Sequence, residues 1–183
     1  INDFTKADNV RQRGVSRMAS LEVVLEKTDR AFSEEEKLAL AEEKNEIYVR
    51  SLSALSETDV LSGANEFIDY LKSKGIKTAV GSASKNTPLI LEKTKLAGKF
   101  DAVSCGLDTT KSKPDPEVFL IAAKKLGVAP CDCVVVEDSD AGIEAAKTGG
   151  MYAIAVGAAE YNPKADVAIK DLESLYRALT IFA

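Results

Sequence analysis

Apolar residues in the first third of the chain recur every three or four positions, and this spacing predicts helices with one buried face. Ser16 can cap the first helix, whose apolar stripe is Met18, Leu21, Val24 and Leu25. Ser33 and Glu36 form the capping box of a second, longer helix. The stripe of this longer helix is Leu38, Ala41, Tyr48, Leu52 and Leu55. Its outer face carries charged residues that we expect to be mostly solvated: Glu42, Glu43, Lys44 and Glu46.

From about Asp59 onward, short apolar runs alternate with helical segments, which is typical of βαβ units over a parallel sheet. Strands are predicted at 77–80, 102–104, 133–136, 153–156 and 167–169. Helices are predicted from 64 to a stop at Gly75, at 88–95, 116–126 and 141–147, and from 172 onward. We therefore expect an α/β protein with a helical module at 1–58 and a doubly wound parallel-sheet core at 59–183. A ligand would lie between the two.

Composition narrows the classes of partner and of chemistry. The formal charge is −5, from 24 Lys and Arg against 29 Asp and Glu, and without a long basic run we expect neither nucleic acid nor membrane as a partner. The chain has no histidine, which excludes Ser-His, Cys-His and His-ligated metal chemistry within it. Cys105, Cys131 and Cys133 form no CxxC pair, which favours reduced thiols. With neither a long apolar span nor a leader pattern, we expect a cytoplasmic protein.

The junction that begins at Val134 carries the strongest chemical signal. An apolar run, Val134 to Val136, leads directly into Glu137 and Asp138 and then into a helix start. Such a run delivers side chains to the carboxyl end of a parallel sheet, where open α/β folds bind ligands. Two adjacent carboxylates suit Mg²⁺, which takes one or two of them and keeps waters. Ser139 with the residue after it would also serve as an ordinary helix cap, so this motif alone leaves both interpretations open.

Two earlier loops have a similar character. Residues 81–86, Gly-Ser-Ala-Ser-Lys-Asn, follow a strand and precede a helix, and their small polar side chains with Lys85 could bind an anion. An ordinary βα turn has the same composition. In residues 111–116, Pro114 and Pro116 restrict the backbone just after Lys113 and hold this lysine in place, as a lysine beside a developing phosphoryl charge requires. A rigid surface turn is the alternative there.

The order of these loops along the chain resembles the haloacid dehalogenase superfamily. Ser82, Lys113 and Glu137-Asp138 correspond to its second, third and fourth motifs, and the resemblance is strongest to the β-phosphoglucomutase subfamily. It covers nearly all 183 residues. Residues 13–17, Arg-Gly-Val-Ser-Arg, resemble the cap loop of that subfamily, with Arg13 in place of its lysine. Arginine keeps the charge but changes the hydrogen-bond geometry.

The resemblance implies a role for each matching residue. Glu137 and Asp138 would hold Mg²⁺, while Ser82 and Lys113 would contact the transferring phosphoryl group. The residues implied for a second phosphate are Arg17, Ser84, Lys85 and Asn86. Ser20 and Lys44 match cap positions that face the sugar.

The implied activity is that of a Mg²⁺-dependent phosphohexomutase acting on a hexose phosphate. It would interconvert β-glucose 1-phosphate and glucose 6-phosphate through an aspartyl phosphate and a bisphosphate intermediate. A sugar-phosphate phosphatase of the same superfamily is the nearest alternative, because it needs no second phosphate site. A non-catalytic phosphosugar-binding protein is the alternative from another class.

One family feature has no counterpart in the chain. The family's first motif, Asp-x-Asp at the end of a leading strand, carries the nucleophile and the acid/base, and neither that strand nor the first cap helix is found here. In the family this strand lies between those leading to Ser82 and Glu137, and without it two strand edges would be exposed. We therefore expect the biological protein to contain this segment and to be a monomer, and this chain alone to be inactive and to bind metal weakly.

Overall fold

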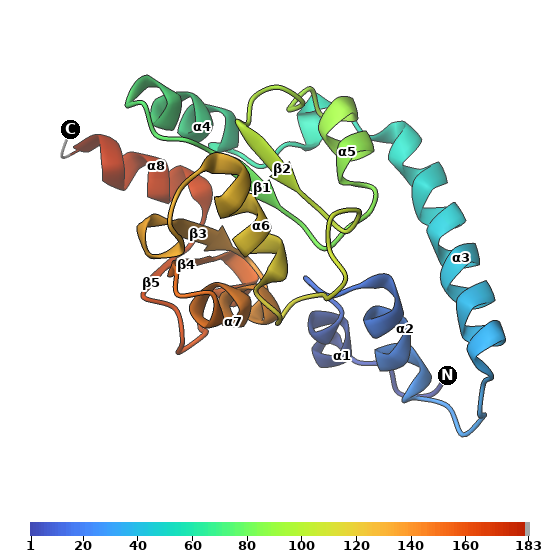
Figure 1. The fold of residues 1–183 in the computed structure, drawn as a ribbon. Helices are drawn as coiled ribbons and strands as arrows, with labels where there is room; N and C mark the ends of the chain where they lie inside the picture. The colour runs from blue at the N-terminus through green and yellow to red at the C-terminus, as the bar shows by residue number, and fades with distance from the viewer. Residues whose placement is uncertain (182–183) are drawn as a thin grey trace.

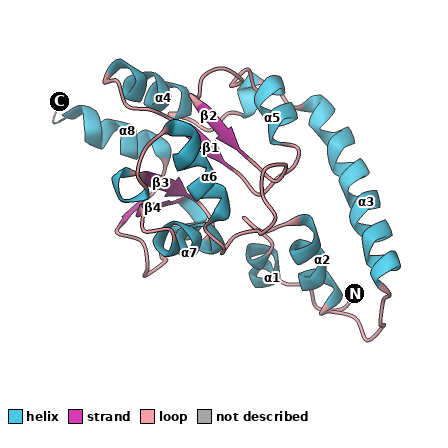
Figure 2. Cartoon of the chain, in the orientation of Figure 1, coloured by secondary structure: helices cyan, strands magenta, loops and turns pink. Residues whose placement is uncertain are grey.

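The computed structural model describes residues 1–181 (Figure 1). We call residues 1–58 the helical module and the described residues from 59 onward the core. The module contains α1 (Lys6–Arg11), α2 (Arg17–Leu25) and α3 (Glu34–Ser51), and 3-10 turns follow at Leu52–Ala54 and Glu57–Asp59. The strands of the described chain all lie in the core (Figure 2).

Side chains cap the module's helices largely as the sequence predicts. Ser16 Oγ accepts the backbone N–H of Ala19 at 3.2 Å, and Ser33 with Glu36 forms the predicted capping box of α3. Helix α1 was not predicted, although it has a capping box of its own. Its 6 residues are too few to show a helical period.

The apolar stripe predicted for the helix that Ser33 caps, now α3, is only partly buried. Helix α3 ends at Ser51, and Ala41 and Leu52 are the buried members of the stripe, whereas Leu38 and Tyr48 are 60% and 43% exposed. The prediction of a fully buried stripe is wrong because this face of α3 borders a cavity. Leu38 and Tyr48 line that cavity rather than packing into a core.

The core contains five parallel strands in two sheets. Strand β1 (Ala79–Gly81) pairs with β2 (Ala102–Ser104), and β4 (Tyr152–Val156) pairs with both β3 (Val134–Glu137) and β5 (Val167–Ile169). The predicted α/β class and all five predicted strands are confirmed: 102–104 and 167–169 match as predicted, and the ends of the other three shift by one or two residues. The single continuous sheet is not observed, since β1 and β3 are not hydrogen-bonded to each other in the described chain. The family strand expected between them stays a prediction.

Helices connect the strands. Helix α4 (Ala64–Ser73) precedes β1, and α5 (Thr87–Lys93), α6 (Glu117–Leu126) and α7 (Asp140–Thr148) follow β1, β2 and β3 in turn. Further 3-10 turns lie at Pro130–Asp132 and Gly157–Ala159, and α8 (Leu172–Ile181) follows β5. No helix in residues 1–181 combines the length and the hydropathy that a membrane crossing requires.

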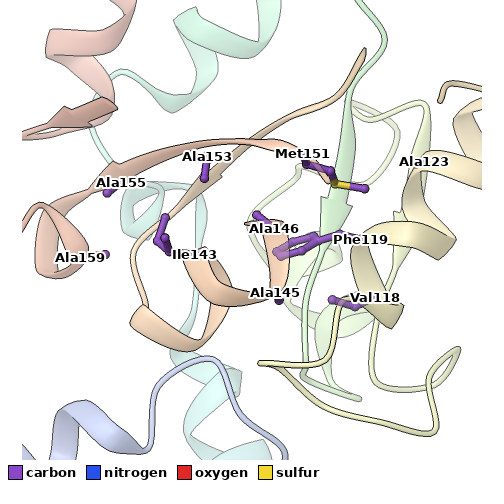
Figure 3. Close-up of a cluster of buried hydrophobic side chains, with 10 residues drawn as sticks. All are labelled: Val118, Phe119, Ala123, Ile143, Ala145, Ala146, Met151, Ala153, Ala155 and Ala159. Carbon is purple, nitrogen blue, oxygen red and sulfur yellow. The ribbon is translucent and has the colours of Figure 1, made fainter. Parts of the chain in front are cut away.

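Small side chains let α7 approach β4 closely. Ile143, Ala145 and Ala146 of α7 have no exposed surface, nor do Ala153 and Ala155 of β4 (Figure 3). Alanine removes the bulk that would separate a helix from a sheet, and the buried isoleucine contributes about 1.5–3 kcal/mol by leaving water. This packing fixes the start of α7, and with it the carboxylates at the end of β3.

Candidate active site

A cavity of about 900 Å³ lies between the helical module and one edge of the core. Its lining includes Gly81 and Glu137, which end β1 and β3, so it lies at the carboxyl ends of parallel strands, where open α/β folds bind ligands. All site residues predicted from the sequence line it: Arg17, Ser20, Lys44, Ser82, Ser84, Lys85, Asn86, Lys113, Glu137 and Asp138. The structure brings these side chains together, and their individual roles stay predictions.

The loop after β1 is held by its own hydroxyl groups. Ser82 Oγ accepts the N–H of Ser84 at 3.2 Å, and Ser84 Oγ accepts the N–H of Asn86 at 3.1 Å. Each hydroxyl acts as an acceptor in these bonds and keeps its own O–H to donate. A Cβ on Gly106 would lie 2.4 Å from the Ala83 carbonyl oxygen, so glycine is required beneath this loop. The loop therefore presents ordered donors to the cavity.

Lys113 joins the three predicted loops. Its side chain is buried, and Nζ donates to Glu137 Oε2 at 2.8 Å and to the Gly81 carbonyl oxygen at 3.2 Å. Nζ also lies 4.6 Å from the centre of the Phe119 ring, within cation–π range. An ammonium has three donors, so one of them remains for a ligand.

The β3–α7 junction can be a helix cap and a metal site at once, and Ser139 shows how. Its Oγ accepts the N–H of Gly142 at 3.1 Å and so caps α7. The same hydroxyl donates to Glu137 Oε1 at 2.6 Å, and the Ser139 N–H donates to that oxygen at 3.1 Å. The helix cap thus orients the Glu137 carboxylate. A Cβ on Gly142 would lie 2.1 Å from Glu137 Cδ, so this orientation also requires glycine there.

Asp138 carries the less compensated charge of the carboxylate pair. In the part of the chain that the structure describes, no other residue forms a hydrogen bond or ion pair with its carboxylate, and its own backbone N–H is the donor that it meets. Desolvation and then the negative charge of Glu137 raise the pKa of Asp138, while its own backbone N–H, Arg13 and Lys113 act in the opposite sense. An unpaired carboxylate beside an oriented one fits Mg²⁺, a hard cation that binds one or two carboxylates and waters. Within residues 1–181 no third Asp, Glu, Cys or His joins them.

The helical module closes over this edge of the core. Gly14 has a φ of +73°, and a Cβ there would lie 2.3 Å from Ser139 Oγ, so the predicted cap loop lies directly against the β3–α7 junction. Deeper in the module, Lys44 Nζ donates to Ser20 Oγ at 3.4 Å, and that hydroxyl donates to Gln12 Oε1 at 3.3 Å. The two predicted sugar-facing residues are thus in contact with each other.

The polar residues that line the cavity but were not predicted as part of a site include Gln12, Glu42 and Asn45. We expected Glu42 to lie on a solvated face, and 61% of its side chain is indeed exposed, although it faces the cavity. One feature of the sequence could have indicated Glu42 and Asn45 as site residues. Asn45 is the neighbour of Lys44, and Glu42 lies three residues before Asn45, hence on the same face of a helix.

Comparison with known proteins shows the family to which the chain belongs. A family model described as haloacid dehalogenase-like hydrolase matches residues 2–150. The chain is 36% identical over 174 residues to Beta-phosphoglucomutase of Bacillus subtilis, covering 94% of this chain and 77% of that protein. It is 36% identical over 137 residues to Hexitol phosphatase B of Escherichia coli, covering 70% and 62%. The structure of a beta-phosphoglucomutase from Clostridium difficile superposes with a TM-score of 0.87 at 34% identity, covering 98% of this chain and 85% of that one.

Proposed function

This chain belongs to the haloacid dehalogenase-like hydrolase family, and we propose that it serves a Mg²⁺-dependent phosphohexomutase that interconverts β-glucose 1-phosphate and glucose 6-phosphate. Its relatives include a mutase and sugar-phosphate phosphatases, so the family alone leaves both reactions open. The observation that supports the mutase is that the same cavity is lined by a second set of side chains whose donors could hold an anion: Arg17, Ser84, Lys85 and Asn86. A bisphosphate intermediate needs two phosphate sites, whereas hydrolysis of a monophosphate needs one.

In the proposed reaction Ser82 and Lys113 contact the transferring phosphoryl group. Lys113 is only 5% exposed, and a fixed charge in such a place stabilises a developing negative charge more strongly than it would in water. Its bonds to Glu137 and to the Gly81 carbonyl hold Nζ in place while one donor stays available. The lysine therefore needs little reorganisation as the charge develops.

Glu137 and Asp138 would hold the Mg²⁺. When bound, the metal supplies neutralisation of charge on the phosphoryl oxygens. Glu137 contributes a carboxylate already oriented by Ser139, and Asp138 contributes an unpaired charge. The module, whose Gly14 lies against Ser139, would limit the access of water to the phosphoryl group.

The proposed intermediate is an aspartyl phosphate, which divides the transfer into two easier steps. The family carries the nucleophile and the acid/base in its first motif, at the end of a leading strand. The first strand of the described chain is β1, which ends at Gly81 and leads to Ser82 instead. We therefore propose that residues 1–183 bind hexose phosphate without turning it over.

Calorimetric titration of the 183-residue chain in MgCl₂ tests the two-phosphate site. Glucose 1,6-bisphosphate is expected to bind more tightly than glucose 6-phosphate by about tenfold or more, since one charge-assisted hydrogen bond contributes about 1.5–3 kcal/mol. R17A should abolish that preference. R11A is the matched control, because Arg11 pairs with Glu26 and does not line the cavity. Equal affinities for the two ligands in the wild type would contradict the mutase proposal.

The phosphatase alternative draws on relatives named Hexitol phosphatase B and Fructose-1-phosphate phosphatase YqaB. A protein that carries the family's first motif separates the reactions, because isomerisation of β-glucose 1-phosphate and release of phosphate can be measured together. We expect R17A to lower isomerisation by about 10- to 100-fold and to spare hydrolysis. Equal loss of both activities would favour the phosphatase. Binding with no Mg²⁺-dependent turnover would favour a non-catalytic phosphosugar-binding protein.

A further inference from the structure

A chain of polar contacts crosses from the helical module to the core along α3. Glu42 Oε2 accepts from Arg17 Nη1 at 2.6 Å, and Glu42 Oε1 accepts from Asn45 Nδ2 at 3.3 Å. Asn45 Oδ1 in turn accepts from Asn86 Nδ2 at 3.0 Å. The start of α2 is thereby connected, through one turn of α3, to the loop after β1.

The two ends of this chain keep most of their donors. A guanidinium has five N–H donors, and the contact with Glu42 uses one of those on Arg17. The Asn86 amide group donates to Asn45 and retains a second N–H. Both residues line the cavity, so the remaining donors can meet an anion there. Glu42 and Asn45 therefore fix the two ends without using up their binding capacity.

We propose that Glu42 and Asn45 are positioning residues that align Arg17 and Asn86 on the second phosphate and hold the module on the core. This inference rests on the proposed function for the identity of the anion. The opposite role for Glu42 is that of an internal anion that competes with phosphate for Arg17. The geometry favours positioning, because Glu42 touches a single terminal nitrogen and leaves the rest of the guanidinium fork open. With 61% of its side chain exposed, its charge is also screened by water.

Titration of the 183-residue chain with glucose 6-phosphate separates the two roles of Glu42. Positioning predicts that E42A weakens binding by about fivefold, equivalent to about 1 kcal/mol, and that E42Q, which can still accept hydrogen bonds, restores most of the affinity. E43A is the matched control, since Glu43 is an exposed neighbour on α3 that does not line the cavity. Tighter binding by both E42A and E42Q would mean competition and would overturn the proposal.

A second measurement, made without any ligand, tests the hydrogen bond between Asn45 and Asn86, which we call the bridge. The side-chain amide resonances of Asn86 should shift in N45A and stay in place in E43A, because N45A removes the acceptor of the Asn86 N–H. Alanine is a better helix former than asparagine, so N45A is expected to keep α3 folded. Unchanged Asn86 resonances in N45A would overturn the bridge. If the wild type bound no glucose 6-phosphate, the proposed function would fail, and the Asn86 resonances would still decide on the bridge.

Discussion

Replacing Lys113 with methionine tests whether its ion pair with Glu137 organises the cavity. The two side chains are 4% and 9% exposed, with Nζ and Oε2 2.8 Å apart. Methionine retains much of the aliphatic length beside Phe119 but leaves the carboxylate without its cation. Removing one partner of a buried pair costs about 3–5 kcal/mol. We expect the lower end, about 3 kcal/mol, because Ser139 still donates two hydrogen bonds to Oε1.

Urea unfolding followed by circular dichroism at pH 7 measures this loss as a change in the free energy of unfolding. The free energy of unfolding should fall less in the K113M/E137Q double variant than in K113M alone, because glutamine leaves no unpaired charge. We expect a coupling energy of at least about 1 kcal/mol. K111M is the control: the Lys111 side chain is 69% exposed and pairs with Asp115 on the surface, so its loss should stay below about 0.5 kcal/mol. A loss below about 1 kcal/mol in K113M, with additive effects in the double variant, would refute the buried pair.

Three further predictions concern other parts of the molecule. G14A should weaken binding of glucose 6-phosphate because its Cβ would push the cap loop off the hydroxyl that caps α7, whereas G75A, with a similar φ of +69° and nothing within 4 Å, should bind normally in the same titration. S104A should raise the free energy of unfolding in urea by about 1 kcal/mol, because the Ser104 hydroxyl is buried without a partner; a loss of stability would contradict this. Hydrogen bonds from Thr5 lower the pKa of Asp8 to about 2, so its stabilising effect should be present above pH 4 and lost as pH falls through 2, and D8N should destabilise at pH 7 but not at pH 2 in thermal melts.

The core was predicted well because each element has a local signal. The run from Val134 to Val136 is apolar and β-branched, and Gly127 ends α6 in a left-handed conformation, as the sequence suggests. Prediction was weaker where burial depends on the neighbours of a helix. Leu38 and Tyr48 have the spacing of a core stripe, yet they border a cavity, since nothing in the period of α3 specifies what lies opposite. The break between β1 and β3 likewise involves residues far apart in the chain.

The contacts within the site also differ in how far the sequence predicts them. Ser82, Lys113 and Glu137 were predictable because each lies at or beyond the carboxyl end of a strand, and parallel strands bring their carboxyl ends to one edge whatever separates them in sequence. The pairing of Lys113 with Glu137 is therefore a consequence of strand order. The contact of Asn45 with Asn86 spans 41 residues and depends on how the helical module lies on the core, which no strand order determines.

This difference bears on how the proposed mutase could keep two phosphates apart. The proposed site for the transferring phosphoryl group lies at the edge of the core, around the buried pair of Lys113 and Glu137. The proposed second site is divided between the loop after β1 and Arg17 of the module, and Glu42 and Asn45 connect the two. The bisphosphate must reorient within the cavity between the two transfers, so each of its phosphates must leave one site and enter the other. The buried ion pair of Lys113 with Glu137 keeps the first site in place, whereas the contacts of Glu42 and Asn45 at the second site are exposed and weaker. Exposed ion pairs contribute at most about 1 kcal/mol and can be broken and remade, which allows the bisphosphate to reorient.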